Sequence, residues 1–179
     1  MDSKTPLKIS SFITESERRE IASWVNNEHQ NERLCFWNTG FYLGGYKFND
    51  PDNQVWDGKL KVLENIPQSF FDIYDRISTL FEKKTLTKGN TAFVNFFDAG
   101  GRIQKHNDSH VENHWHVRCN VLIVKPEEGT LKIEEDEHDQ DEKELVCFLA
   151  DKYEHEVTKI KGKRIVLSYA MVVPKECFD

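Results

Sequence analysis

The feature that most restricts the fold of this chain is a series of short strand-like segments in its second half. Apolar runs of strand length alternate there with turns such as Asp98-Ala99-Gly100-Gly101 and Pro126-Glu127-Glu128-Gly129. So many short strands in so few residues indicate a β-sandwich or a β-barrel. The predicted strands cover residues 91–97, 103–108, 117–124, 130–133, 145–149, 156–160 and 164–173.

Two helical segments precede this β-region. Thr14 and Glu17 match a capping box, and apolar residues at helical spacing then predict a helix to about Asn27. A second helix with a broad apolar face begins at Ile66-Pro67. Between the helices, residues 31–57 are rich in aromatic residues, glycine and asparagine, which predicts short strands and long loops. Such aromatic loops can line a substrate pocket, although packing in the core or on edge strands is the commoner role.

The order of these segments predicts an α+β fold in which helices pack on a β-sandwich or barrel. A chain of 179 residues is large enough for one domain with its own core. We therefore expect a single domain over residues 1–179. Residues 1–90 form a support region of helices and aromatic loops, and residues 91–173 form the β-core.

Composition excludes several functional classes. The formal net charge of −7 argues against nucleic acid as a partner, because phosphate binding needs a basic surface. The sequence shows no apolar stretch of signal-peptide or transmembrane length. Its four cysteines are scattered, and Cys119 and Cys147 lie within apolar runs as expected for buried free thiols. We therefore expect a cytoplasmic protein without a membrane association.

The strongest chemical signal is the pattern His106-Asn107-Asp108 followed much later by His155. Residues i and i+2 of a strand point to the same side, so His106 and Asp108 can converge on one ion. The interval to His155 leaves room for several strand crossings. Two histidines and one carboxylate are the ligand set of a facial Fe(II) site, which leaves the other coordination positions open. We predict that His106, Asp108 and His155 bind the metal and are catalytic.

A rival metal site is present in the same segment. His110, His114 and His116 lie close to His106, and His114 and His116 are themselves an i, i+2 pair. A zinc site needs three or four converging ligands, which these histidines could supply.

Further polar residues lie on the predicted strands. Alternation places Arg164, Val166, Ser168 and Ala170 on one face, where a buried arginine is costly unless it meets an anion. The guanidinium fork suits a carboxylate, so Arg164 is a candidate for binding a dicarboxylate such as 2-oxoglutarate, with Ser168 as an additional donor. Two more candidates for cosubstrate or substrate contacts lie on the strand 117–124: Arg118 and Asn120.

These residues resemble the 2-oxoglutarate- and Fe(II)-dependent dioxygenase superfamily. The resemblance rests on His106-Asn107-Asp108, the distal His155 and Arg164, and it covers residues 93–172. It implies a double-stranded β-helix, or jelly-roll, core with N-terminal covering helices. It also implies Fe(II) as the metal, 2-oxoglutarate as the cosubstrate and O2 as the oxidant.

Two branches of that superfamily remain open. Residues 95–101, which lead into His106, are similar to prolyl 4-hydroxylases, although Phe97 stands where that branch usually has a tyrosine. Residues 118–129 are more similar to aspartyl/asparaginyl β-hydroxylases, in which an arginine at the place of Arg118 helps to hold the cosubstrate. Asn120 stands where that branch often has a histidine, and Asp108 supplies a carboxylate that some of its members lack.

The function implied is hydroxylation of an amino-acid residue or a small amino-acid-like substrate, with release of succinate and CO2. The substrate can be a small molecule, a peptide or a protein. Two alternatives are a non-catalytic or zinc-binding β-sandwich interaction module, and a cupin-type metal enzyme that does not use 2-oxoglutarate. Arg164 argues against the interaction module, which does not need an arginine one strand after the last ligand. A cupin-type enzyme would be expected to use more histidine ligands.

Overall fold

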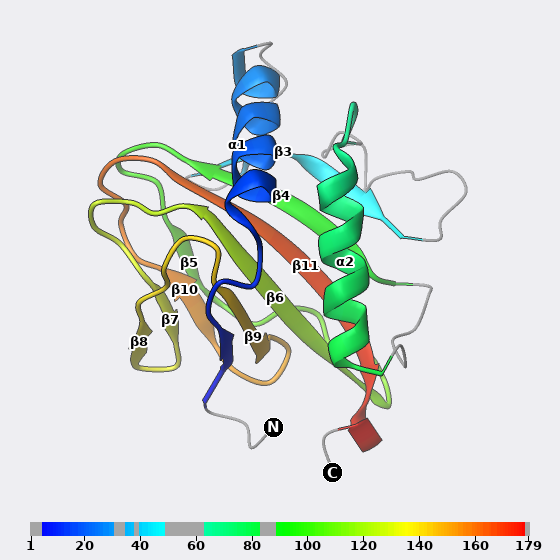
Figure 1. The fold of residues 1–179 in the computed structure, drawn as a ribbon. Coiled ribbons are helices and arrows are strands. Elements are labelled where there is room, and N and C mark those ends of the chain that lie inside the picture. Colours follow the sequence, from blue (N-terminus) through cyan, green and yellow to red (C-terminus); the bar gives the residue numbers. More distant parts are fainter. Residues whose placement is uncertain (1–4, 31–34, 38–39, 49–62, 83–88, 178–179) are drawn as a thin grey trace.

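Two antiparallel sheets form the body of the protein, shown in Figure 1. The computed structural model describes residues 5–30, 35–37, 40–48, 63–82 and 89–177. The larger sheet has seven strands, and the smaller has four. Across the larger sheet the order is β1 (Leu7–Ile9), β9 (Leu145–Leu149), β6 (His114–Val124), β11 (Arg164–Pro174), β4 (Thr91–Phe97), β3 (Gly40–Lys47) and β2 (Cys35–Trp37). Across the smaller sheet it is β5 (Ile103–His106), β10 (His155–Val157), β7 (Leu131–Ile133) and β8 (Asp136–His138).

Two helices lie on one side of the larger sheet (Figure 1), and a short 3-10 helix, η2 (Lys175–Cys177), follows β11. Helix α1 (Glu15–Gln30) begins with the predicted capping box. The Thr14 backbone N–H donates to Glu17 Oε2 at 2.7 Å, and the Glu17 N–H donates to Thr14 Oγ1 at 3.2 Å. Helix α2 (Gln68–Leu80) follows Pro67, and Arg76 Nη2 pairs with Glu17 Oε1 at 2.7 Å across the helices. No helix in the described ranges is both long and apolar enough to cross a bilayer.

Strand alternation gives the two faces of the larger sheet different partners. On β11, Ile165, Leu167 and Tyr169 belong to the same buried apolar cluster as Ile21 of α1 and Phe70 of α2. The even-numbered residues of β11, from Arg164 onward, point to the opposite face. The register extends this division to the neighbours of β11, because Ser168 lies across from Asn120 on β6 and from Phe93 on β4. The polar residues therefore gather on the face that the helices do not cover.

The strand predictions are largely confirmed, with differences at strand ends. Strands β4 and β9 have the predicted bounds, whereas β6 begins earlier, at His114. Strand β5 ends at His106, so Asp108 lies in the following loop rather than in the predicted strand 103–108. Strand β10 covers His155–Val157 instead of 156–160, because its pairing with β5 and β7 extends over residues 155–157.

Part of the predicted architecture lies outside the described residues. Strands β2 and β3 agree with the short strands expected in the aromatic stretch 31–57, but residues 31–34, 38–39 and 49–57 are not described. The same holds for residues 83–88 of the polar turn before β4. Within the described part of the aromatic stretch, the rings of Tyr46 and Phe48 pack against Phe70 of α2.

Candidate active site

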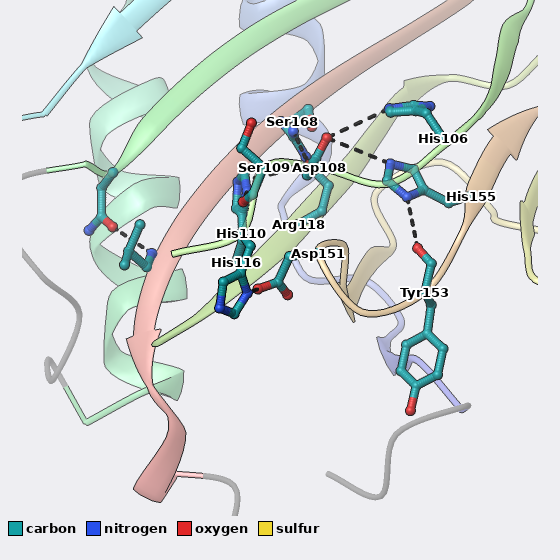
Figure 2. Close-up of polar contacts among 12 residues, drawn as sticks. His106, Asp108, Ser109, His110, His116, Arg118, Asp151, Tyr153, His155 and Ser168 are labelled. Atoms are coloured by element: carbon teal, nitrogen blue, oxygen red, sulfur yellow. Dashed lines mark hydrogen bonds and ion pairs between the residues drawn. The ribbon is translucent and has the colours of Figure 1, made fainter. Parts of the chain in front are cut away.

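His106, Asp108 and His155 converge at one edge of the smaller sheet, as Figure 2 shows. Their candidate ligand atoms all lie within 4.8 Å of one another. His106 Nε2 is 3.6 Å from Asp108 Oδ1, and His155 Nε2 is 4.0 Å from the same oxygen. The His155 side chain is 9% exposed and that of His106 is 41% exposed, so the site has a buried wall and an open rim. Two imidazole nitrogens and one carboxylate oxygen form the donor set expected for Fe(II).

Strand pairing brings the two histidines together. His155 on β10 lies directly across from His106 on β5, and their ring centroids are 4.3 Å apart. Asp108 reaches the site from the loop after β5, and its backbone N–H donates to the carbonyl of Ala150 at 2.8 Å. The prediction of i, i+2 neighbours on one strand is therefore wrong in its reason, because a loop anchored on the end of β9 positions the carboxylate.

Each histidine is oriented by a hydrogen bond from its other ring nitrogen. His106 Nδ1 is 2.8 Å from the carbonyl oxygen of Gln104, and His155 Nδ1 is 3.3 Å from that of Tyr153. A carbonyl oxygen can only accept, so in the neutral ring Nδ1 carries the proton and Nε2 keeps its lone pair. Each Nε2 faces Asp108 Oδ1, so the three lone pairs point into one space, as the ligands of a single ion must.

Burial and charge set the protonation of these three residues. Burial lowers the pKa of His155 to about 4, which keeps its imidazole neutral at pH 7. The hydrogen bond to Asp108 raises the pKa of His106 despite partial burial. Burial raises the pKa of Asp108, but the charge of Arg118 and the hydrogen bond from His106 outweigh it and hold that pKa well below its usual range. The site thus offers one permanent negative charge to a cation.

Arg118, a predicted cosubstrate residue, contacts the carboxylate of Asp108. Its Nε donates to Asp108 Oδ2 at 3.0 Å, and its Nη2 donates to the same oxygen. Its Nη1 donates to Ser168 Oγ at 3.4 Å, which joins two of the predicted residues. Asn120, on the same strand as Arg118, lies across from Ser168, and its side-chain Oδ1 is buried without a hydrogen-bond donor among the described residues.

Arg164 is a buried charge without a counter-ion in the described part of the chain. The residue is 4% exposed, and burial lowers the pKa of its guanidinium to about 10. Its one described partner is the ring of Phe97, whose centroid lies 5.8 Å from Cζ. The residue also lines a small pocket with Leu122, Thr130 and Leu131. An uncompensated buried guanidinium is costly, so this arrangement suits a carboxylate ligand.

The rival histidines do not form a metal site. Among the described residues, His106, Asp108 and His155 are the only three histidine, cysteine or acidic residues whose ligand atoms gather closely enough for one ion. His114 Nδ1 contacts the carbonyl of Glu112 at 2.8 Å instead. His116 Nε2 lies 3.8 Å from Asp108 Oδ2, on the side that Arg118 occupies. The zinc alternative is therefore wrong for the described residues.

Three polar residues at the site were not predicted in their observed roles. Asn95 on β4 shares the inner face, and its buried Oδ1 has no donor among the described residues. Asp151 has a fully buried side chain whose Oδ2 is 3.3 Å from His110 Nδ1 (Figure 2). His116 approaches the carboxylate rather than a zinc ion. Alternation along β4 could have identified Asn95, whereas the contact of Asp151 depends on loop geometry and has no sequence signal.

Comparison with known structures confirms the fold. A prolyl-4-hydroxylase from Pseudomonas putida aligns with a TM-score of 0.66 at 14% identity, over 95% of this chain and 93% of that one. A prolyl hydroxylase from Trichoplax adhaerens, solved with a peptide fragment of the hypoxia inducible factor oxygen degradation domain, gives 0.69 at 13% identity, over 96% and 84%. A viral collagen prolyl hydroxylase from Paramecium Bursaria Chlorella virus-1, in its 2OG complex, gives 0.62 at 12%, over 97% and 98%. The predicted double-stranded β-helix is therefore confirmed.

Fold and site together define a 2-oxoglutarate- and Fe(II)-dependent dioxygenase that acts as a hydroxylase. A family model described as aspartyl/asparaginyl beta-hydroxylase matches residues 11–174. The chain belongs to this family, because the match spans nearly its whole length. The chain matches no curated protein sequence. Of the two branches that the motifs left open, the family match falls on the second.

Proposed function

We propose that this hydroxylase binds Fe(II) through His106 Nε2, Asp108 Oδ1 and His155 Nε2, and 2-oxoglutarate through Arg164. The observation that carries the proposal is the presence of two complementary sites on the inner side of one fold. One is a cluster of three donor atoms within 4.8 Å that carries a negative charge, and the other is a buried guanidinium without a counter-ion. A divalent cation would bind the three donor atoms, and the far carboxylate of a dicarboxylate would compensate the guanidinium of Arg164.

The cosubstrate would lie along the inner face of the larger sheet. Its keto acid end would reach the metal, and its far carboxylate would pair with Arg164 on β11. Ser168 and Asn120 lie across from each other on this face, and Ser168 is four residues, or two pleat repeats, along β11 from Arg164. The described donors of this face therefore fit an elongated anion.

The protein's part in the reaction is to orient ligands and to exclude water. Bound iron and 2-oxoglutarate together supply the oxidising power that inserts an oxygen atom from O2 into a substrate C–H bond, with release of succinate and CO2. His155 and Asp108 form the buried wall, and the apolar residues Phe93, Phe97 and Val166 line the inner face. His106, whose side chain is 41% exposed, lies at the rim through which a substrate can approach.

For the substrate, we propose a side chain of a peptide or protein rather than a free metabolite. The structurally similar Trichoplax adhaerens enzyme was solved with a peptide fragment, and the matching family is described by its action on aspartyl and asparaginyl groups. The open rim at His106 supports this choice, because an extended chain can cross it while one side chain enters. A peptide library enriched in aspartate, asparagine and proline would test it by mass spectrometry for a gain of one oxygen.

The decisive test of the metal and cosubstrate sites is anaerobic titration of the Fe(II)-loaded protein with 2-oxoglutarate. Formation of the chelate gives a visible charge-transfer band, which the proposal expects in the wild-type protein. His106→Ala and Asp108→Ala should lose the band and succinate production, whereas the matched control His114→Ala should keep both. Wild-type succinate production in His106→Ala and Asp108→Ala would show that the ligand assignment is wrong.

We also propose that residues 1–179 act as one domain in the cytoplasm. The interhelical pair between Arg76 and Glu17, and the apolar cluster shared by helices and sheet, support a single unit. Cys119 and Cys147 support a reducing compartment, since they lie directly across from each other on β6 and β9 as free, buried thiols.

A further inference from the structure

The two oxygens of the Asp108 carboxylate face different groups. Oδ1 faces His106 Nε2 at 3.6 Å and His155 Nε2 at 4.0 Å, which is the side of the proposed metal. Oδ2 accepts from Nε of Arg118 at 3.0 Å and from Nη2 of the same guanidinium, and His116 Nε2 lies 3.8 Å away. Each oxygen therefore has its own environment, and the second is already occupied by the protein.

Arg118 is itself held in place by neighbouring strands. Its Nη1 donates to Ser168 Oγ on β11 at 3.4 Å, and its Cζ lies 5.4 Å from the ring centroid of Phe93 on β4. Its side chain is 15% exposed. Asp108, by contrast, lies in a loop whose backbone is tied to the sheet through the Ala150 carbonyl. A strand-borne arginine therefore fixes the orientation of a loop-borne ligand.

We propose that Arg118 is a positioning residue that occupies Asp108 Oδ2 and thereby restricts Asp108 to a single metal–oxygen bond through Oδ1. The proposal rests on the metal centre put forward above. A carboxylate without such a partner can bind a metal through both oxygens. The facial site needs two open positions for a chelating keto acid and one for O2, so a second bond to Asp108 would remove a position that the chemistry uses.

This role differs from the one that the family resemblance gave to Arg118, namely holding the cosubstrate directly. Every donor nitrogen of Arg118 with a described partner points at Asp108 or Ser168. If Arg118 acts on the carboxylate, its replacement changes how the metal is bound before any cosubstrate is added. If it acts on the cosubstrate, its replacement changes the affinity for 2-oxoglutarate and leaves the bound metal unaltered.

Mn(II) separates the two roles, because it binds the same kind of ligands and its relaxation of water protons reports the number of coordinated waters. In the wild-type protein without 2-oxoglutarate, three protein ligands leave three positions for water. In Arg118→Met we expect the relaxivity per bound Mn(II) to fall by about one third, as the second carboxylate oxygen displaces a water.

Two further variants make the result specific. Arg118→Lys keeps a cationic donor and should restore part of the relaxivity, whereas Arg19→Met, on an exposed part of α1, should leave the relaxivity unchanged. Should Arg118→Met fail to fold, Ser168→Ala removes the hydroxyl that orients Arg118 and should lower the relaxivity per bound Mn(II) by a smaller amount. A folded Arg118→Met protein with wild-type relaxivity per bound Mn(II) overturns the inference, whatever its affinity for 2-oxoglutarate.

The same measurement distinguishes failure of this inference from failure of the proposed function. His106→Ala should abolish Mn(II) binding if the metal centre is correctly placed. If His106→Ala leaves Mn(II) binding unchanged, both the metal centre and the role of Arg118 are wrong. If it abolishes binding while Arg118→Met keeps wild-type relaxivity, the metal centre stands and the role of Arg118 is wrong.

Discussion

Replacing Arg164 with methionine should make the ligand-free protein more stable while it removes the affinity for 2-oxoglutarate. Burial lowers the pKa of this guanidinium from 12.5 to about 10. A difference of one in pKa corresponds to about 1.4 kcal/mol, so burying the charge of Arg164 costs roughly 3 kcal/mol. Methionine fills a similar volume without a charge, and such replacements of buried ions commonly stabilise proteins by about 1–4 kcal/mol. Loss of the contact with the Phe97 ring removes up to about 2 kcal/mol, which leaves a net gain of roughly 1–2 kcal/mol.

Binding of 2-oxoglutarate should reverse the difference in stability between the wild-type protein and Arg164→Met. A ligand that binds only the folded state stabilises it by about 2.7 kcal/mol when present at a hundred times its dissociation constant. The wild-type protein gains this free energy because Arg164 then has a carboxylate partner, whereas Arg164→Met gains little. With saturating 2-oxoglutarate, the wild-type protein should therefore equal or exceed the variant in stability.

The assay is urea unfolding followed by tryptophan fluorescence, on Mn(II)-loaded protein under anaerobic conditions, with and without 2-oxoglutarate. Arg19→Met serves as the control, because the Arg19 side chain is 75% exposed and its loss should change stability by less than about 0.5 kcal/mol. The reasoning is refuted if ligand-free Arg164→Met is less stable than the wild type by more than about 1 kcal/mol. It is equally refuted if 2-oxoglutarate stabilises both proteins by the same amount.

Three further predictions concern stability. The pKa of His155 is about 4 in the folded protein against 6.5 ordinarily, so the unfolded state binds more protons between pH 4 and 6.5. The free energy of unfolding of the metal-free protein should therefore fall by up to about 3 kcal/mol as pH is lowered from 6.5 to 4. Urea unfolding across this range measures the fall, and an equal fall in His155→Gln would contradict the prediction. Thr14→Ala removes the capping box of α1 and should lower the free energy of unfolding by about 1 kcal/mol, whereas no change would deny the cap a role. Gly129→Ala and Gly100→Ala both place a side chain at positive φ, but only at Gly129 would the Cβ lie 2.6 Å from Ile160 Cδ1, so thermal melts should show the larger loss there by about 1–3 kcal/mol.

The sequence predicts the structure best where local pattern and burial agree. Strands β4 and β9 were predicted with their observed bounds, because apolar runs between turn residues specify buried strands. Arg164 was identified because an arginine on the buried face of a strand is rare without an anion, and its burial is confirmed. The predicted metal ligands do converge.

What the sequence did not reveal depends on contacts between distant segments. Strand β1 was not predicted, because three residues carry little periodicity and its strand character comes from pairing with β9, far along the chain. The contact of Arg118 with Asp108 joins a strand to a loop, so no spacing rule predicts it. The acidic segment 134–144 is typical of a solvated hairpin or loop, and the pairing of β8 with β7 makes it part of a hairpin.

The alternation of the larger sheet has a consequence for how such an enzyme can diversify. On β6 and β11 the odd-numbered residues from Val117 to Ile123 and from Ile165 to Val173 form the core beneath the helices, and the even-numbered ones face the site. Of two adjacent positions on these strands, one therefore contributes to the stability of the core and the other to the chemistry of the site. New substrate preferences can be explored at every second residue of these strands while the packing that maintains the fold is left untouched, whereas a one-residue insertion would exchange the two sets and destroy both.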